Sequence, residues 1–133
     1  MNDCIFCKII RKEVPAYIVY EDEHSVAFLD INPISLGHIL VVPKKHYERI
    51  TDMPEDYLKE FMASVQKVAK IIETKLSRDY NIVVNHGSKA GQIINHVHFH
   101  IIPRYGQEQL FIWTTHKLTE EEAEKILDTL KGV

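Results

Sequence analysis

Residues 96–102, with the sequence HVHFHII, constrain the fold more tightly than any other segment of the chain. Successive side chains of a β-strand point to opposite faces, so alternate residues share a face. A strand here would carry three imidazoles on one face, about 6.5–7 Å apart along the backbone. The histidines are His96, His98 and His100, and the apolar residues that alternate with them are Val97, Phe99 and Ile101. We therefore predict a strand over residues 94–103 that buries one face in a core and presents histidines on the other.

Three interpretations of this histidine-lined face are open. The side chains could be ordinary core histidines, but three neighbouring desolvated imidazoles would each need a hydrogen-bond partner. They could together bind a metal, because neutral imidazole is a common ligand and H-x-H can chelate. One of them could act as a nucleophile, with its neighbours setting its tautomer and handling protons.

Other segments predict the elements around this strand. Apolar residues recur at three- and four-residue spacing from Pro54 to about Ser77, which predicts one long helix. Thr119 and Glu122 form a capping-box pattern that opens a C-terminal helix. Short apolar runs typical of strands lie at 16–20, 25–29, 38–42 and 80–84. The sequence predicts an α+β fold, an antiparallel sheet of about five strands with one long helix and a C-terminal helix.

Length and charge limit the class of protein. With 133 residues and a mass of 15.5 kDa, the chain is expected to form a single domain over residues 1–133. Its net charge is −3 and it has no long basic block, so nucleic acid is not an expected partner. No stretch approaches the roughly 18 apolar residues of a membrane span. The N-terminal residues lack the apolar core of a secretory signal. We therefore expect a cytoplasmic protein that does not bind membranes.

The two cysteines, Cys4 and Cys7, form a C-x-x-C pair. With only two cysteines and no export signal, a disulfide framework is excluded and a metal or redox role is left. A thioredoxin-type redox pair is the less favoured alternative, because this pair is not expected to open a helix after a buried strand.

The arrangement as a whole resembles the histidine triad (HIT) family, whose signature is three histidines alternating with apolar residues. Residues 85–92 (NHGSKAGQ) resemble the family's N-x-G-x-x-A-G-Q loop, and residues 101–104 match its I-P-R ending. Further blocks match at 4–7, 28–33 and 37–46. The resemblance covers about residues 4–104, whereas the tail and helix at 105–133 are more variable in the family. It implies the HIT fold, and in particular the zinc-containing type of bacteria and archaea.

The resemblance implies catalytic roles for four histidines. In the family the middle histidine of the triad, here His98, attacks the α-phosphorus of a nucleotide ester, anhydride or phosphoramidate. Water then releases a nucleoside monophosphate from the nucleotidyl-imidazole. The backbone carbonyl of His96 holds the other ring nitrogen of His98. His100 is placed to bind the phosphate and assist the leaving group, and His38 supports the triad from an adjacent strand.

The loop before the triad is expected to bind the substrate's phosphate together with His98 and His100. Gly91 permits close approach of the backbone, and Asn85 and Gln92 offer neutral amide donors.

Asp30 and the adjacent Ile31 are expected at the ribose of the substrate, again from the resemblance. The alternative for Asp30 is an Asx turn before Pro33. One position departs from the family, because many members carry Ser or Thr directly after the Gln of the loop and this chain has Ile93. The preference for a leaving group and the rate therefore do not carry over.

A structural zinc site is expected from Cys4, Cys7, His46 and His96, which match the ligands of some HIT proteins. Two thiolates and two imidazoles suit tetrahedral zinc with no open position. The alternative has the cysteines as small buried apolar side chains and His46 at the surface.

The resemblance implies a hydrolase or transferase that acts on purine nucleotides and forms homodimers. The alternative is a zinc-stabilised nucleotide-binding module with negligible turnover. The missing hydroxyl at Ile93 keeps this alternative open, whereas an in-line histidine at position 98 favours the enzyme.

Overall fold

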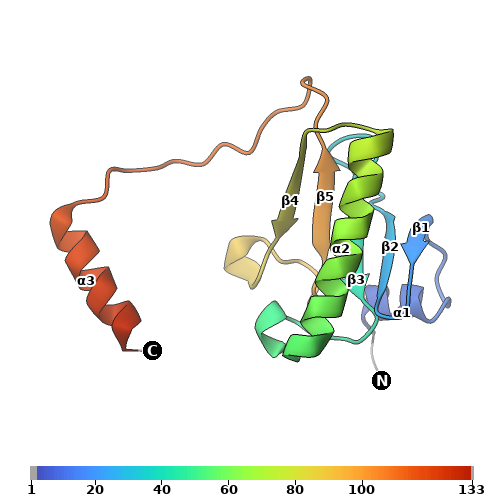
Figure 1. The fold of residues 1–133 in the computed structure, drawn as a ribbon, viewed down its shortest axis with the longest axis horizontal. Coiled ribbons are helices and arrows are strands. Elements are labelled where there is room, and N and C mark those ends of the chain that lie inside the picture. Colours follow the sequence, from blue (N-terminus) through green and yellow to red (C-terminus); the bar gives the residue numbers. More distant parts are fainter. Residues whose placement is uncertain (1–2, 133) are drawn as a thin grey trace.

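The computed structural model describes residues 3–132 and contains one five-stranded antiparallel sheet in the order β1-β2-β3-β5-β4 (Figure 1). The strands are β1 (Ile18–Glu21), β2 (Ser25–Leu29), β3 (Ile39–Pro43), β4 (Tyr80–Val84) and β5 (Phe99–Pro103). The helices are α1 (Ile5–Ile10), α2 (Glu55–Lys75) and α3 (Glu120–Lys131), with short 3-10 turns η1 (Ile50–Asp52) and η2 (Ser88–Ala90). The predicted α+β class and the antiparallel sheet are confirmed.

The strand predicted over residues 94–103 is shorter than expected. Only β5, Phe99–Pro103, pairs with its neighbours β3 and β4. The backbone N–H of Val97 donates instead to the carbonyl of Tyr47, 2.7 Å away, outside the sheet. The first two histidines of the triad therefore lie on the segment that leads into β5, and only His100 lies within the strand.

Two apolar clusters cover the two faces of the sheet. Alternate residues of β3 separate cleanly between them, because Ile39 and Val41 face α2 whereas Leu40 and Val42 face α1. The α2 cluster also contains Phe61 and Ile72. Figure 1 shows the long α2 lying across one face of the sheet. The other face is left for α1 and the histidines.

The short helix α1 is not anticipated by the sequence analysis. Cys4 is its N-cap residue, so the C-x-x-C pair does open a helix, although no strand precedes it. Phe6 and Ile9 of α1 are buried against Val26 and Phe28 of β2. This packing brings both cysteines to the histidine face of the sheet.

The C-terminal helix α3 stands apart from the sheet, at the end of an extended segment (Figure 1). The predicted capping box is present: the Glu122 N–H donates to the Thr119 hydroxyl, and the Glu122 carboxylate accepts from the Thr119 N–H. None of the α3 residues is buried. No helix within residues 3–132 is both long and apolar enough to cross a membrane.

Candidate active site and metal centre

Four histidines gather on the face of the sheet that α1 covers. His100 comes from β5, His98 and His96 from the segment before it, and His38 from the residue before β3. The residues that alternate with the triad are buried in the α2 cluster, as predicted: Val97, Phe99 and Ile101. The alternation of faces therefore extends beyond the hydrogen-bonded part of the strand.

The ring of His98 is held in one tautomer by the backbone. Its Nδ1–H donates to the carbonyl of His96 over 2.7 Å, so in the neutral ring the lone pair lies on Nε2. Burial lowers the pKa of His98 below its ordinary value of 6.5, partly opposed by this hydrogen bond, which raises it. A buried, neutral imidazole with an unprotonated Nε2 is competent as a nucleophile near pH 7.

His100 and His38 form a second histidine pair. His38 Nε2 lies 3.0 Å from His100 Nδ1, and the rings of His100 and His98 lie 5.0 Å apart. Burial lowers the pKa of His100 to about 4, with the neighbouring His98 and His38 lowering it further. His100 is therefore neutral near pH 7 and can serve a phosphate as a hydrogen-bond donor.

Phe6 is a site residue that the sequence analysis did not identify. Its ring packs edge-on against His98 at 5.1 Å and against His96 at 5.9 Å. It also contacts Phe28 at 5.5 Å, which ties the site to the apolar cluster under α1. Phe6 thus desolvates one side of the triad. The only signal was its place between the two cysteines.

The loop of residues 85–92 lies between β4 and the triad, and Gly87 and Gly91 have φ values of +89° and +99°. Residues other than glycine rarely adopt such φ values, so these two positions favour glycine. Gln92 is buried, and both ends of its amide bond within the protein: Oε1 accepts from Gly87 N–H at 2.7 Å and Nε2 donates to the Glu48 carbonyl at 3.1 Å. Asn85 is half-buried beside Gly91. A contact from any of them to substrate stays a prediction.

The two carboxylate oxygens of Asp30 lie close to different neighbours. Oδ1 accepts from the N–H of Asn32 at 2.8 Å, which is the Asx turn weighed as the alternative. Oδ2 lies 3.5 Å from His38 Nε2. Ile31 is 79% exposed. The turn does not exclude a ribose contact, because an ionised carboxylate can accept several hydrogen bonds.

Cys4, Cys7, His46 and His96 converge, and their four ligand atoms lie within 4.8 Å of one another. The sulfur of Cys4 is 3.4 Å from His96 Nδ1, and that of Cys7 is 3.3 Å from His46 Nδ1 and 3.6 Å from His96 Nδ1. Ligand bonds of 2.0–2.3 Å around tetrahedral zinc imply sulfur–nitrogen separations of about 3.5 Å. The donor set therefore fits a closed zinc site.

The buried ring of His96 is oriented for this role from behind. Its Nε2–H donates to the carbonyl of Pro43 over 2.9 Å, which leaves the lone pair on Nδ1, the atom that faces the cysteines. Burial lowers the pKa of His96 to about 4, so the ring is neutral, as a ligand must be. An acceptor behind a ligating imidazole is the usual arrangement in metal sites.

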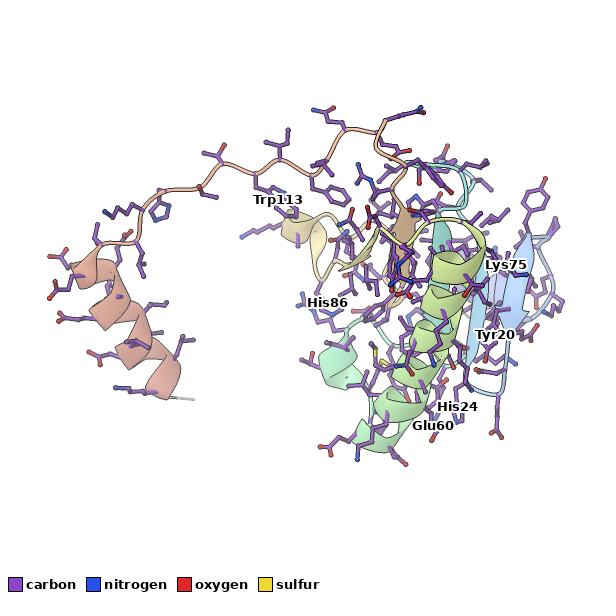
Figure 2. The ribbon with its side chains drawn as sticks, turned by 45° about the horizontal axis from the view of Figure 1, so that its top comes forward. Tyr20, His24, Glu60, Lys75, His86 and Trp113 are labelled. Atoms are coloured by element: carbon purple, nitrogen blue, oxygen red, sulfur yellow. The ribbon has the colours of Figure 1, made fainter. Side chains whose placement is uncertain are left out.

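Two side chains outside the triad, Ile93 and Trp113, are largely exposed to solvent. Ile93 is 90% exposed and so does not pack the loop. Trp113 is 76% exposed and projects from the extended segment that leads to α3 (Figure 2). Its ring stacks on Phe111 at 5.8 Å.

Comparison with known proteins agrees with this geometry. Residues 11–107 match the family model described as HIT domain. An uncharacterized HIT-like protein of Methanocaldococcus jannaschii is 63% identical over 103 residues, 77% of this chain and 79% of its own length. An adenosine 5'-monophosphoramidase of Candida albicans, HNT1, is 40% identical over 106 residues, 76% and 70% of the two chains. The crystal structure of a HIT family member from Bacillus subtilis superposes with a TM-score of 0.90 at 39% identity, covering 98% of this chain and 96% of that one.

Proposed function

This chain belongs to the HIT domain family, and we propose that it is a nucleotide hydrolase or transferase that cleaves at the α-phosphate. Its substrates would be purine nucleotide phosphoramidates, anhydrides or dinucleoside polyphosphates, and its product a nucleoside monophosphate. The Candida albicans relative carries the name of a phosphoramidase, which supports this class of substrate.

The observation that carries the proposal is the fixed tautomer of His98. Its Nδ1–H is bound to the His96 carbonyl at 2.7 Å, so the nucleophilic lone pair is available on Nε2 without prior loss of a proton. A module that only binds nucleotides has no need of a desolvated imidazole with one free lone pair.

The reaction proceeds in two displacements. Nε2 of His98 forms a bond to the α-phosphorus while the bond from phosphorus to the leaving group breaks and the leaving group takes the Nε2 proton of His100, which gives a nucleotidyl-histidine. Water then attacks phosphorus and gives a proton back to Nε2 of His100, the phosphorus–nitrogen bond breaks, and the monophosphate leaves with both rings neutral again. His100 donates a hydrogen bond to the phosphate, and His38 supports His100 through their 3.0 Å contact.

Substrate contacts follow from the family resemblance and the placement of the residues. Asp30 and Ile31 would meet the ribose, and Asn85, Gly91 and Gln92 would line the phosphate. Both ends of the Gln92 amide are already engaged within the loop, so we propose that it acts on the phosphate by holding the loop's shape.

The test replaces the nucleophile. In His98→Ala, turnover of adenosine 5′-phosphoramidate and of a diadenosine polyphosphate should vanish while nucleotide binding persists. Mass spectrometry of the quenched wild-type reaction should show a nucleotidyl adduct on the peptide that contains His98. The exposed His116 supplies a matched control, since His116→Ala should keep full activity. Full turnover in His98→Ala would refute the assignment.

The second candidate is a nucleotide-binding module with negligible turnover. It is favoured by Ile93, which places an exposed apolar side chain where many members have a hydroxyl. The same assay separates the two, because this candidate predicts tight nucleotide binding with neither turnover nor adduct in wild type.

We also propose that the chain is of the zinc-containing type, with Cys4, Cys7, His46 and His96 as ligands of one structural zinc. When bound, zinc would tie α1 to the segment before β5. Four protein ligands leave no position for an activated water, so the metal would take no part in the chemistry. Elemental analysis should find about one zinc per chain, and the Cys4→Ser/Cys7→Ser protein should contain none. A native protein without metal, whose stability the double substitution leaves unchanged, would return the cysteines to simple packing.

We propose that the chain forms a homodimer, with the arm formed by residues 105–132 as one of its contact surfaces. The apolar side chains of α3 are about half exposed or more in one chain: Ile126, Leu127 and Leu130. β4 is an edge strand, with Ile82 47% exposed, and could extend the sheet across two copies. Light scattering should give twice the chain mass, and Leu127→Asp should weaken association. A monomer in wild type would refute this. The cytoplasmic location stays a prediction.

A further inference from the structure

A second cluster near the triad has the spacing of a metal site. Ligand atoms of Asp30, His38 and His100 lie within 4.8 Å of one another. His38 Nε2 is 3.0 Å from His100 Nδ1 and 3.5 Å from Asp30 Oδ2. The corresponding edges of a zinc tetrahedron measure about 3.3 Å. Distances alone therefore do not separate this cluster from the cysteine–histidine site.

The two clusters differ in the group that lies behind the histidine ring, which for His38 is a backbone N–H. The backbone N–H of Ile34 donates to His38 Nδ1 over 3.1 Å, so the neutral ring must carry its proton on Nε2. A ligating nitrogen needs a lone pair, and a proton moved to Nδ1 would oppose the N–H of Ile34. His96 shows the opposite arrangement, because its rear nitrogen faces the Pro43 carbonyl and its front nitrogen keeps the lone pair.

We propose that the backbone N–H of Ile34 sets His38 and His100 as a hydrogen-bond chain and so closes the cluster that they form with Asp30 to metal ions. The Nε2–H of His38 donates to Nδ1 of His100, which places the proton of His100 on its own Nε2. His100 is thereby a donor at its outer nitrogen while His98 is a nucleophile at its outer nitrogen. His98 and His100 therefore have opposite tautomers. The N–H of Ile34 lies behind the His38–His100 pair, whereas the carbonyl of His96 lies behind the ring of His98.

The loop that carries Ile34 is fixed to the strand that carries His100. The buried hydroxyl of Ser35 donates to the Pro103 carbonyl over 2.6 Å, and Pro103 ends β5. Two residues beyond β5, the hydroxyl of Tyr105 donates to the Leu36 carbonyl, also over 2.6 Å. These two bonds hold the Ile34 N–H in register with the histidine pair. Ile34 is therefore a positioning residue that acts through His38.

The use of the outer proton of His100 on a phosphate rests on the proposed function, whereas the tautomers do not. They can be read in the protein without substrate, so failure of this inference and failure of the hydrolase proposal are distinguishable.

The first test is nitrogen NMR of the full chain labelled with ¹⁵N-histidine, in which long-range couplings distinguish the tautomers. His38 and His100 should carry their protons on Nε2, and His98 on Nδ1. A His38 ring protonated on Nδ1 would overturn the proposal. This measurement needs no substitution.

The second test removes the donor. Ile34→Pro lacks the N–H, whereas Ile34→Val keeps it, and the side chain at this position is 46% exposed. With one equivalent of zinc present, Co²⁺ should broaden the NMR signals of His38 and His100 at concentrations roughly tenfold or more lower in the proline variant than in the valine variant. The proline variant should also populate the other His38 tautomer. Equal Co²⁺ binding in both folded variants would overturn the proposal, and if the proline variant does not fold, the wild-type tautomers decide.

Discussion

Gln92 offers a sharp test of whether the phosphate loop is held by internal hydrogen bonds. In Gln92→Leu the side chain keeps its approximate volume but loses the bonds to the Gly87 N–H and the Glu48 carbonyl. A buried group left without a partner costs about 1–3 kcal/mol. Glu48 is exposed, so water can reach its carbonyl in part, whereas the Gly87 N–H is half-buried. The expected loss of unfolding free energy is therefore about 2–3 kcal/mol.

The assay is urea unfolding of the full chain at fixed excess zinc, followed by circular dichroism. With a slope of about 2 kcal/mol per molar urea, the midpoint should fall by about 1–1.5 M. Gln107, which is exposed in the extended segment, supplies the control, and Gln107→Leu should change stability by less than about 0.5 kcal/mol.

A direct contact from Gln92 to the phosphate would give a different pattern. KM would rise while stability stayed the same, because the lost bond would exist only with substrate bound. A stability loss in Gln92→Leu no larger than that of the Gln107 control would refute the internal role. The loop bond to Glu48 also predicts weaker metal retention in the variant, because Glu48 lies two residues after the ligand His46.

Three further predictions concern protons, the leaving group and the metal. The pKa of His100 is lowered to about 4, so kcat/KM, measured with zinc in excess to keep the metal bound, should hold as pH falls from about 7 to 5 and decline only toward about 4. A decline centred near 6.5 would contradict a neutral His100. The unfolded chain takes up this proton near the ordinary histidine pKa of 6.5, whereas the folded chain takes it up only near 4. His100 should therefore lower the free energy of unfolding as pH falls from about 6.5 to about 4. Ile93→Ser should raise kcat with phosphoramidates by up to about a hundredfold, since one donor at a well-formed site is worth on the order of 3 kcal/mol; the exposed Ile93 loses no packing, so reduced kcat in a folded variant would show that no donor is missing. Removing zinc with a chelator should lower the melting temperature, and the metal should dissociate as pH falls toward about 5 because the ligands take up protons; an unchanged melting temperature would speak against a structural role.

The sequence by itself determined the histidine face and the elements around it. In an extended chain a two-residue period places His98 and His100 on one side and Phe99 on the other, and this pattern held even where strand pairing stopped. The long helix and the capping box at Thr119 were predictable because their signals are local in the sequence: apolar residues repeat every three or four positions in the helix, and the capping box joins two residues three positions apart.

The tertiary structure decided which nitrogen of each ring does what. That choice depends on single groups distant along the chain, such as the Pro43 carbonyl behind His96, 53 residues away. It also depends on a backbone N–H at Ile34 that no side-chain pattern reveals. Periodicity fixes the face to which a side chain points, but it carries no information about which donor or acceptor the fold places behind it. For imidazoles, whose chemistry depends on the position of one proton, that missing group separates a metal ligand, a nucleophile and a hydrogen-bond donor.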